Sequence, residues 1–292
     1  MAKAGKDVKV VSVGGAGTRA GLAGAFGAAA GLVLFIVNAL TVYLILSSIY
    51  SIVGLFQTIG FSDPFNLIGQ ALGIVSASTS SVSFTFYLDI MAFIFMGIAL
   101  ILLWMKIKES GGSAFMAALG AFFFAGIALY VRFFLLPPIM LSFDQMAIAG
   151  SPMNIIIFGS IVLGLFGFVT IFLIQGIAFF IFGLFTRKTL NKINNTYGKI
   201  ARGGRLILTV SIMNLISMVA LFIAVPLLQG AITTLISGLG GGGGGIPDIS
   251  SLLVPLILFG VGVFLKMITI PILTMFAFLS LAFGFRGIAK GA

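Results

Sequence analysis

The stretch RKTLNKINNTYGKIARGGR, residues 187–205, decides how the rest of the chain is interpreted. It is the one long polar segment, and hydrophobic sequence surrounds it on both sides. It contains no acid and six basic residues, which are Arg187, Lys188, Lys192, Lys199, Arg202 and Arg205. Because basic loops of membrane proteins stay on the cytoplasmic side, we predict a cytoplasmic loop here. Three glycines, Gly198, Gly203 and Gly204, are expected to interrupt any helix in it.

The composition on both sides of this stretch is that of an integral membrane protein. Hydrophobic residues make up 60% of the chain and charged residues 8%, against about a quarter charged in an ordinary soluble protein. A membrane-spanning helix needs about 20 apolar residues. Six blocks are long enough, at residues 21–53, 84–105, 114–140, 153–185, 206–236 and 252–285. The sequence therefore predicts an all-α, polytopic membrane protein whose single domain, residues 21–288, has six transmembrane helices.

The distribution of charge predicts the orientation of these spans. Fourteen of the 16 Lys and Arg residues fall in the tail 1–20, the turn after the second span, the loop 187–205 or the C-terminal end, which closes with the tail 289–292. The three remaining loops carry only Asp63, Asp144 and Asp248 as charges. Both termini are therefore expected in the cytoplasm, with the protein in the cell membrane.

Two of these outer loops have further features. Ser62-Asp63-Pro64 is a good helix start, so residues 65–75 are expected to form a short helix at the outer interface. The loop 238–248 contains a run of six glycines and is expected to be a spacer.

The residues that the chain lacks exclude several kinds of chemistry. It contains no Cys and no His, and only six acids. Thiol nucleophiles, imidazole bases and the usual metal ligands are therefore scarce or missing. We expect no enzyme activity, no bound metal and no cofactor from this chain alone.

The net charge of +10 has two interpretations. Nucleic acid is one possible partner, but the positive-inside rule explains the same charge more simply. The expected partner is the bilayer itself. The six basic residues of the loop 187–205 are expected to be solvated or to contact anionic lipid headgroups, and contact with an acidic protein or nucleic acid is the third possibility.

A stripe of glycines marks the first span. Gly21, Gly24, Gly27 and Gly31 recur at spacings of three and four residues. Small residues at this spacing let two helix backbones approach closely in lipid. We expect this stripe to pack against another helix, and the alternative is a weakly hydrophobic interfacial segment.

Three charges fall inside the predicted spans: Asp89, Arg132 and Lys266. Asp89 and Arg132 lie at similar distances from the turn between the second and third spans, so we expect them to face each other as a pair. Lys266 has no acid at its expected depth. Gln175 and Asn214 offer it side-chain oxygens if the helices are broken or shifted, and snorkelling, a water-filled cavity or an acid on another subunit are the other solutions.

Arg132 and Lys266 share a pattern, because Pro137 and Pro271 each follow five residues later. An inverted repeat of three plus three spans would leave such a pattern, although unrelated kinked helices would too.

Two functions remain open from the sequence. The first is a non-catalytic subunit of a larger membrane assembly, such as a translocation or secretion apparatus, held to other membrane subunits or to copies of itself. The second is a transporter or channel whose path passes Asp89, Arg132 and Lys266. The sequence favours the subunit, because transport sites usually contain more polar groups than these three.

Overall fold

The computed structural model describes residues 17–59, 70, 74, 83–106, 111–138, 141, 151–197, 200–240 and 250–291, and every one of them is helical. Six helices are long and apolar enough to cross a membrane, so the predicted all-α fold with six spans is confirmed. The predicted interfacial helix 65–75, apart from residues 70 and 74, lies outside the described residues, as do residues 1–16 and residues 241–245 of the six-glycine run.

The first three spans are single helices or nearly so. They are α1 (Gly17–Ile59), α3 (Ser83–Lys106) and α4 (Gly111–Tyr130), which continues through a π-helical turn, η2 (Val131–Leu135). The fourth and fifth spans are α6 (Ser151–Tyr197) and α7 (Ile200–Gly240). The sixth span is interrupted: α8 (Ser250–Phe264) leads through a second π-helical turn, η3 (Leu265–Thr269), into α9 (Ile270–Gly291).

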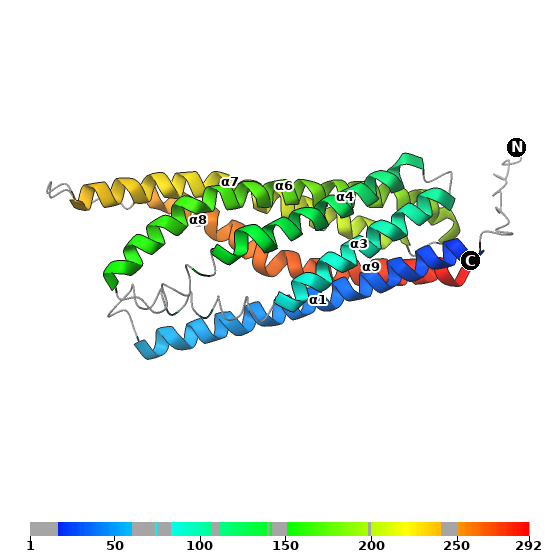
Figure 1. Cartoon of the computed structure of the whole chain (residues 1–292), viewed down its shortest axis with the longest axis horizontal. Helices are drawn as coiled ribbons and strands as arrows, with labels where there is room; N and C mark the ends of the chain where they lie inside the picture. The colour runs from blue at the N-terminus through cyan, green and yellow to red at the C-terminus, as the bar shows by residue number, and fades with distance from the viewer. Residues whose placement is uncertain are drawn as a thin grey trace, which may run out of the picture.

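These spans form a closed ring. In chain order α1, α3, α4, α6, α7 and α9 each contact the next helix, and α9 contacts α1. The blue start of α1 and the red end of α9 lie at the same end of the bundle, here called the proximal end (Figure 1). The opposite end is called the distal end. Both ends of the described chain therefore lie at the proximal end of the bundle.

Glycines close the ring between its first and last spans. An added Cβ at Gly24 would lie 2.6 Å from the backbone nitrogen of Ala289, and one at Gly27 would overlap the ring of Phe285. Gly31 is similarly close to Ala282, whereas Gly21 has nothing within 4 Å. Three of the four glycines of the predicted stripe thus face α9 of the same chain.

The polar stretch 187–205 is helical wherever it is described. Helix α6 continues to Tyr197 and α7 begins at Ile200, so the expectation that Gly203 and Gly204 interrupt the helix was wrong. Gly198 lies outside the described residues. Gly203 and Gly204 are buried inside α7, against Leu281 of α9 and against Arg187 and Leu190 of α6. Here glycine permits the close approach of neighbouring helices, which outweighs its low helix propensity.

The two π-helical turns have the same local cause. The N–H of Leu136 bonds to the carbonyl of Val131, and the N–H of Ile270 bonds to that of Leu265. Both are bonds over five residues instead of four, and a proline, Pro137 or Pro271, comes next in the chain. A proline cannot donate a helical hydrogen bond and clashes with the carbonyl four residues earlier. The widened turn accommodates that clash, and it contains Arg132 in η2 and Lys266 in η3.

Candidate functional site: a polar cavity inside the ring

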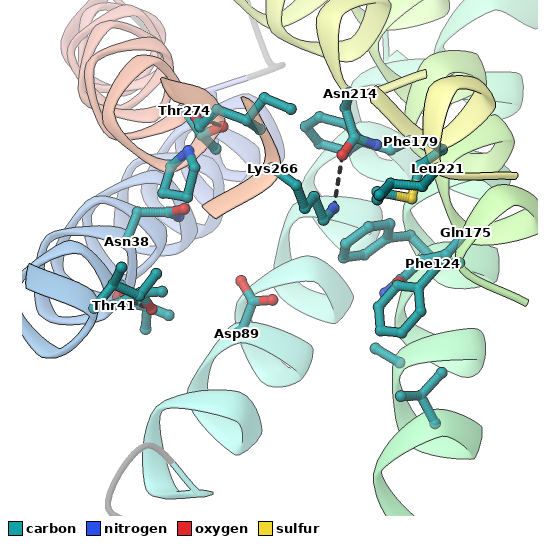
Figure 2. Close-up of a pocket in the computed structure, with 18 of the residues that line it drawn as sticks. Asn38, Thr41, Asp89, Phe124, Gln175, Phe179, Asn214, Leu221, Lys266 and Thr274 are labelled. Atoms are coloured by element: carbon teal, nitrogen blue, oxygen red, sulfur yellow. Dashed lines mark hydrogen bonds between the residues drawn. The ribbon is translucent and has the colours of Figure 1, made fainter. Parts of the chain in front are cut away.

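A cavity of about 520 Å³ lies inside the ring, and residues of all six spans line it. This volume is in the range of small-molecule sites, about 300–1,000 Å³. Most of the wall is apolar, and eight polar or charged side chains interrupt it: Asn38, Thr41, Asp89, Arg132, Gln175, Asn214, Lys266 and Thr274. All three predicted intramembrane charges therefore line one cavity. Figure 2 shows two of them, Asp89 and Lys266.

Lys266 is held from the fifth span. Its ammonium donates a hydrogen bond of 2.7 Å to Oδ1 of Asn214 on α7, drawn as the dashed line in Figure 2. Of the solutions considered for Lys266, the contact with the amide oxygen of Asn214 is confirmed, and Lys266 makes it from the π-helical turn η3. Both side chains line the cavity, so the hydrogen bond to Asn214 keeps the ammonium of Lys266 in the cavity wall.

Asp89 is the acid that faces Lys266. Its carboxylate on α3 points toward the ammonium across the cavity (Figure 2), and the two charges act on each other electrostatically. The expectation that Lys266 has no acid at its depth was wrong. That expectation assigned Asp89 to Arg132, which left only the acids of the outer loops, whereas Asp89 in fact faces Lys266.

Arg132 has a different neighbour from the one expected. Its guanidinium carbon lies 5.8 Å from the centroid of the Tyr87 ring, within the range of a cation–π contact. Residues 87–89 and Arg132 are thus at similar depth, as the hairpin geometry predicted. The described residues nevertheless include no ion pair within 4.0 Å between Asp89 and Arg132. Asp89 is turned toward Lys266 instead.

A layer of phenylalanines closes the cavity toward the proximal end. The rings of Phe93, Phe124, Phe179, Phe182 and Phe278, here called the phenylalanine cluster, come from α3, α4, α6 and α9. The centroid of Phe93 lies 4.3 Å from that of Phe124, 6.2 Å from Phe179, and 5.7 Å from Phe182 and Phe278. Offset and edge-to-face pairs of this kind add to the free energy of burial.

The order of polar and aromatic residues repeats on three helices. Phe93 follows Asp89 by four residues, Phe179 follows Gln175 by four, and Phe278 follows Thr274 by four. A spacing of four places both members on one face of a helix, one turn apart. Because α3, α6 and α9 all run toward the proximal end, the polar layer lies on the distal side of the aromatic layer.

Three polar residues of the cavity were missed from the sequence: Asn38, Thr41 and Thr274. Each donates to the carbonyl four residues earlier, at 2.6–2.8 Å. This bond uses the only hydrogen of each threonine hydroxyl and one of the two amide hydrogens of Asn38. The available signal was an uncharged polar residue inside an apolar span. Attention to charges alone overlooked it.

The basic residues of the stretch 187–205 lie at the proximal end, away from the cavity. Arg187, Lys188, Lys192, Arg202 and Arg205 are all exposed. The ammonium of Lys188 lies 5.1 Å from the centroid of the Phe185 ring. Lys199 is outside the described residues. The predicted contact with anionic lipid headgroups stays a prediction.

Neither a metal site among the described residues nor a similarity to known proteins identifies what this cavity binds. Among the described residues no three His, Cys, Asp or Glu side chains come together where they could hold a metal ion. The chain matches no protein-family model, no curated protein and no solved structure. The function therefore has to be argued from the cavity.

Proposed function

We propose that this chain is a membrane carrier that binds a small solute in the cavity and moves it across the bilayer. The observation that supports this most is that all six spans line one cavity that contains Asp89, Arg132 and Lys266. A charge in the centre of a bilayer costs at least about 2.5–3.5 kcal/mol on insertion scales. Binding of a solute between these three charges would explain why the chain bears this cost.

The cavity weakens the reason for preferring an assembly subunit. That preference depended on the small number of intramembrane polar groups. The ring gathers eight polar or charged side chains around one space, which is sufficient for a solute of modest size. Membership of a larger assembly stays a prediction beside the carrier function.

The phenylalanine cluster favours a carrier over an open channel. It separates the cavity from the proximal end, and four of its members are at most 5% exposed: Phe93, Phe179, Phe182 and Phe278. A solute that binds from the distal side therefore needs a conformational change to leave on the proximal side. The π-helical turns η2 and η3 are suitable hinges, because widened turns next to prolines lack regular helical hydrogen bonds.

Other properties complete the proposal. We expect the carrier to lie in the cell membrane with its proximal end in the cytoplasm, where the exposed basic residues would contact anionic lipids. Catalysis is not part of this proposal.

Solute exchange in vesicles tests the function with one labelled compound from each of four chemical classes. The purified chain is reconstituted and exposed to an amino acid, an organic acid, a sugar and an amine. We expect exchange of at least one class to be faster than in protein-free vesicles. Ala128→Trp, which fills the cavity wall, should abolish it. Phe123→Trp, five residues earlier on α4 at a side chain that is 64% exposed, should not.

The opposite result is also clear. If none of the four classes exchanges faster than in protein-free vesicles, the carrier proposal is wrong and the subunit interpretation gains support.

A further inference from the structure

The opposed charges of the cavity indicate what kind of solute fits it. Asp89 and Lys266 face each other across the space (Figure 2), yet no hydrogen bond or ion pair within 4.0 Å joins them in the described part of the chain. Two opposite charges held apart in a site of low dielectric gain free energy from any group that bridges them. The bridging group must itself present a positive and a negative end.

Both charges have hydrogen-bonding capacity left for such a group. An ammonium has three donors, and the one hydrogen bond that the described residues give Lys266 goes to Asn214. A carboxylate has about four acceptor positions, and within the described ranges Asp89 accepts no hydrogen bond. Two donors and a full set of acceptors therefore remain on opposite sides of one space.

The rest of the wall determines the body of the solute. The phenylalanine cluster forms the proximal floor, and Phe172 and Phe259 add further rings to the lining. A sugar would need many hydrogen bonds that this apolar wall does not offer. An aliphatic or aromatic body would instead be stabilised by burial against these rings.

We infer that the cavity binds a small zwitterion of the amino-acid type with an apolar side chain, its ammonium beside Asp89 and its carboxylate beside Lys266. This inference rests on the carrier function proposed above and specifies its solute. Two uncharged amides also line the cavity, Asn214 beside Lys266 and Gln175 on α6, and each can accept or donate a hydrogen bond.

Three probes with one carbon skeleton test the inference on the unmodified protein. Leucine has both charges, 4-methylpentanoate lacks the amine, and 3-methylbutylamine lacks the carboxylate. Binding is measured calorimetrically with the purified chain in lipid nanodiscs. We expect saturable binding of leucine and at least tenfold weaker binding of the other two, because each leaves one charge of the protein without a partner.

Variants then assign the two ends of the ligand. Lys266→Gln should weaken leucine binding at least tenfold and leave 3-methylbutylamine unchanged. Asp89→Asn should weaken leucine equally and leave 4-methylpentanoate unchanged. Lys188→Gln, at the exposed proximal end, is the matched control and should change nothing.

Two results would overturn the inference. One is that either single-charge compound binds as tightly as leucine, and the other is that none of the three compounds binds. In both cases the exchange assay with four solute classes separates a wrong solute from a wrong function. Exchange of another class would keep the carrier, and exchange of none would remove it as well.

Discussion

Lys266 is the residue on which most of the site depends. It occupies the break in the sixth span, it bonds to Asn214 on the fifth, and it faces Asp89 on the second. A lysine in this setting loses hydration, and the amide oxygen and the opposed carboxylate compensate for part of that loss. The contribution of each of these groups to the free energy of unfolding therefore depends on whether the others are present.

A double-mutant cycle measures this dependence. We predict that Asp89→Leu and Lys266→Leu each lower the free energy of unfolding, and that the double variant loses less than the sum. The expected coupling is roughly 0.5–3 kcal/mol, the range for residues that interact. The control cycle combines Asp89→Leu with Arg132→Leu. Since Asp89 is turned toward Lys266, its coupling to Arg132 should be smaller, and the reverse order would contradict the geometry described above.

At the scale of the helix, small residues determine which elements can touch. The glycines of α1 bring its backbone against α9, and Gly120 of α4 brings it against the backbone of Phe182 on α6, where an added Cβ would lie 2.7 Å away. Hydrophobic attraction does not hold helices together in lipid, so packing of this closeness supplies much of the stability.

Two glycines of the same helix allow a matched test. Gly24→Ala places a Cβ against the backbone of Ala289, which cannot rotate away, so we predict a loss of roughly 1–3 kcal/mol, as for other overpacked sites. Gly21→Ala meets nothing within 4 Å and should be neutral, or more stable by up to about 1 kcal/mol through helix propensity. Thermal unfolding in one detergent compares the two. Equal stability of both variants would show that α1 and α9 are not in this contact.

The helices differ in how far the sequence determines them. The six spans follow from composition, because only a helix satisfies its own backbone hydrogen bonds in hydrocarbon. The link between Lys266 and Asn214 was also foreseeable, since a charge in lipid needs a polar partner. That Asp89 faces Lys266 and not Arg132 could not be foreseen, because it depends on how the six spans pack in three dimensions. The helical conformation of Gly203 and Gly204 was also not foreseeable, because close packing against neighbouring helices outweighed the low helix propensity of glycine.

At the scale of the whole molecule, closure of the ring creates the site. No single span carries more than a few of the polar side chains, and the cavity exists because α9 returns to α1. The pattern of contacts is the same in both halves. Helices α1, α3 and α4 follow one another as α6, α7 and the sixth span do, and the third span of each half contacts the first of the other. With Arg132 and Lys266 in equivalent π-helical turns, this is compatible with the inverted repeat considered from the sequence.

Orientation of the ring is a separate prediction. The basic proximal end should face the cytoplasm. Single cysteines are introduced into this naturally Cys-free chain and labelled from outside intact cells. Labelling is expected at Ser78→Cys and Gly243→Cys and not at Asn195→Cys. The opposite pattern would reverse the assignment of the two sides.

The most direct test of the central claim, that the ring encloses a cavity reached by solutes, is the reactivity of two cysteines on α1. Thr41 lines the cavity, and Tyr43, two residues further on, is 67% exposed on the outside of the bundle, where lipid would surround it. A charged, membrane-impermeant thiol reagent reacts with a thiolate, which requires water. In proteoliposomes we predict that Thr41→Cys reacts at least tenfold faster than Tyr43→Cys. If Thr41→Cys is as unreactive as Tyr43→Cys from both sides of the membrane, no solute reaches the cavity and the carrier function is contradicted.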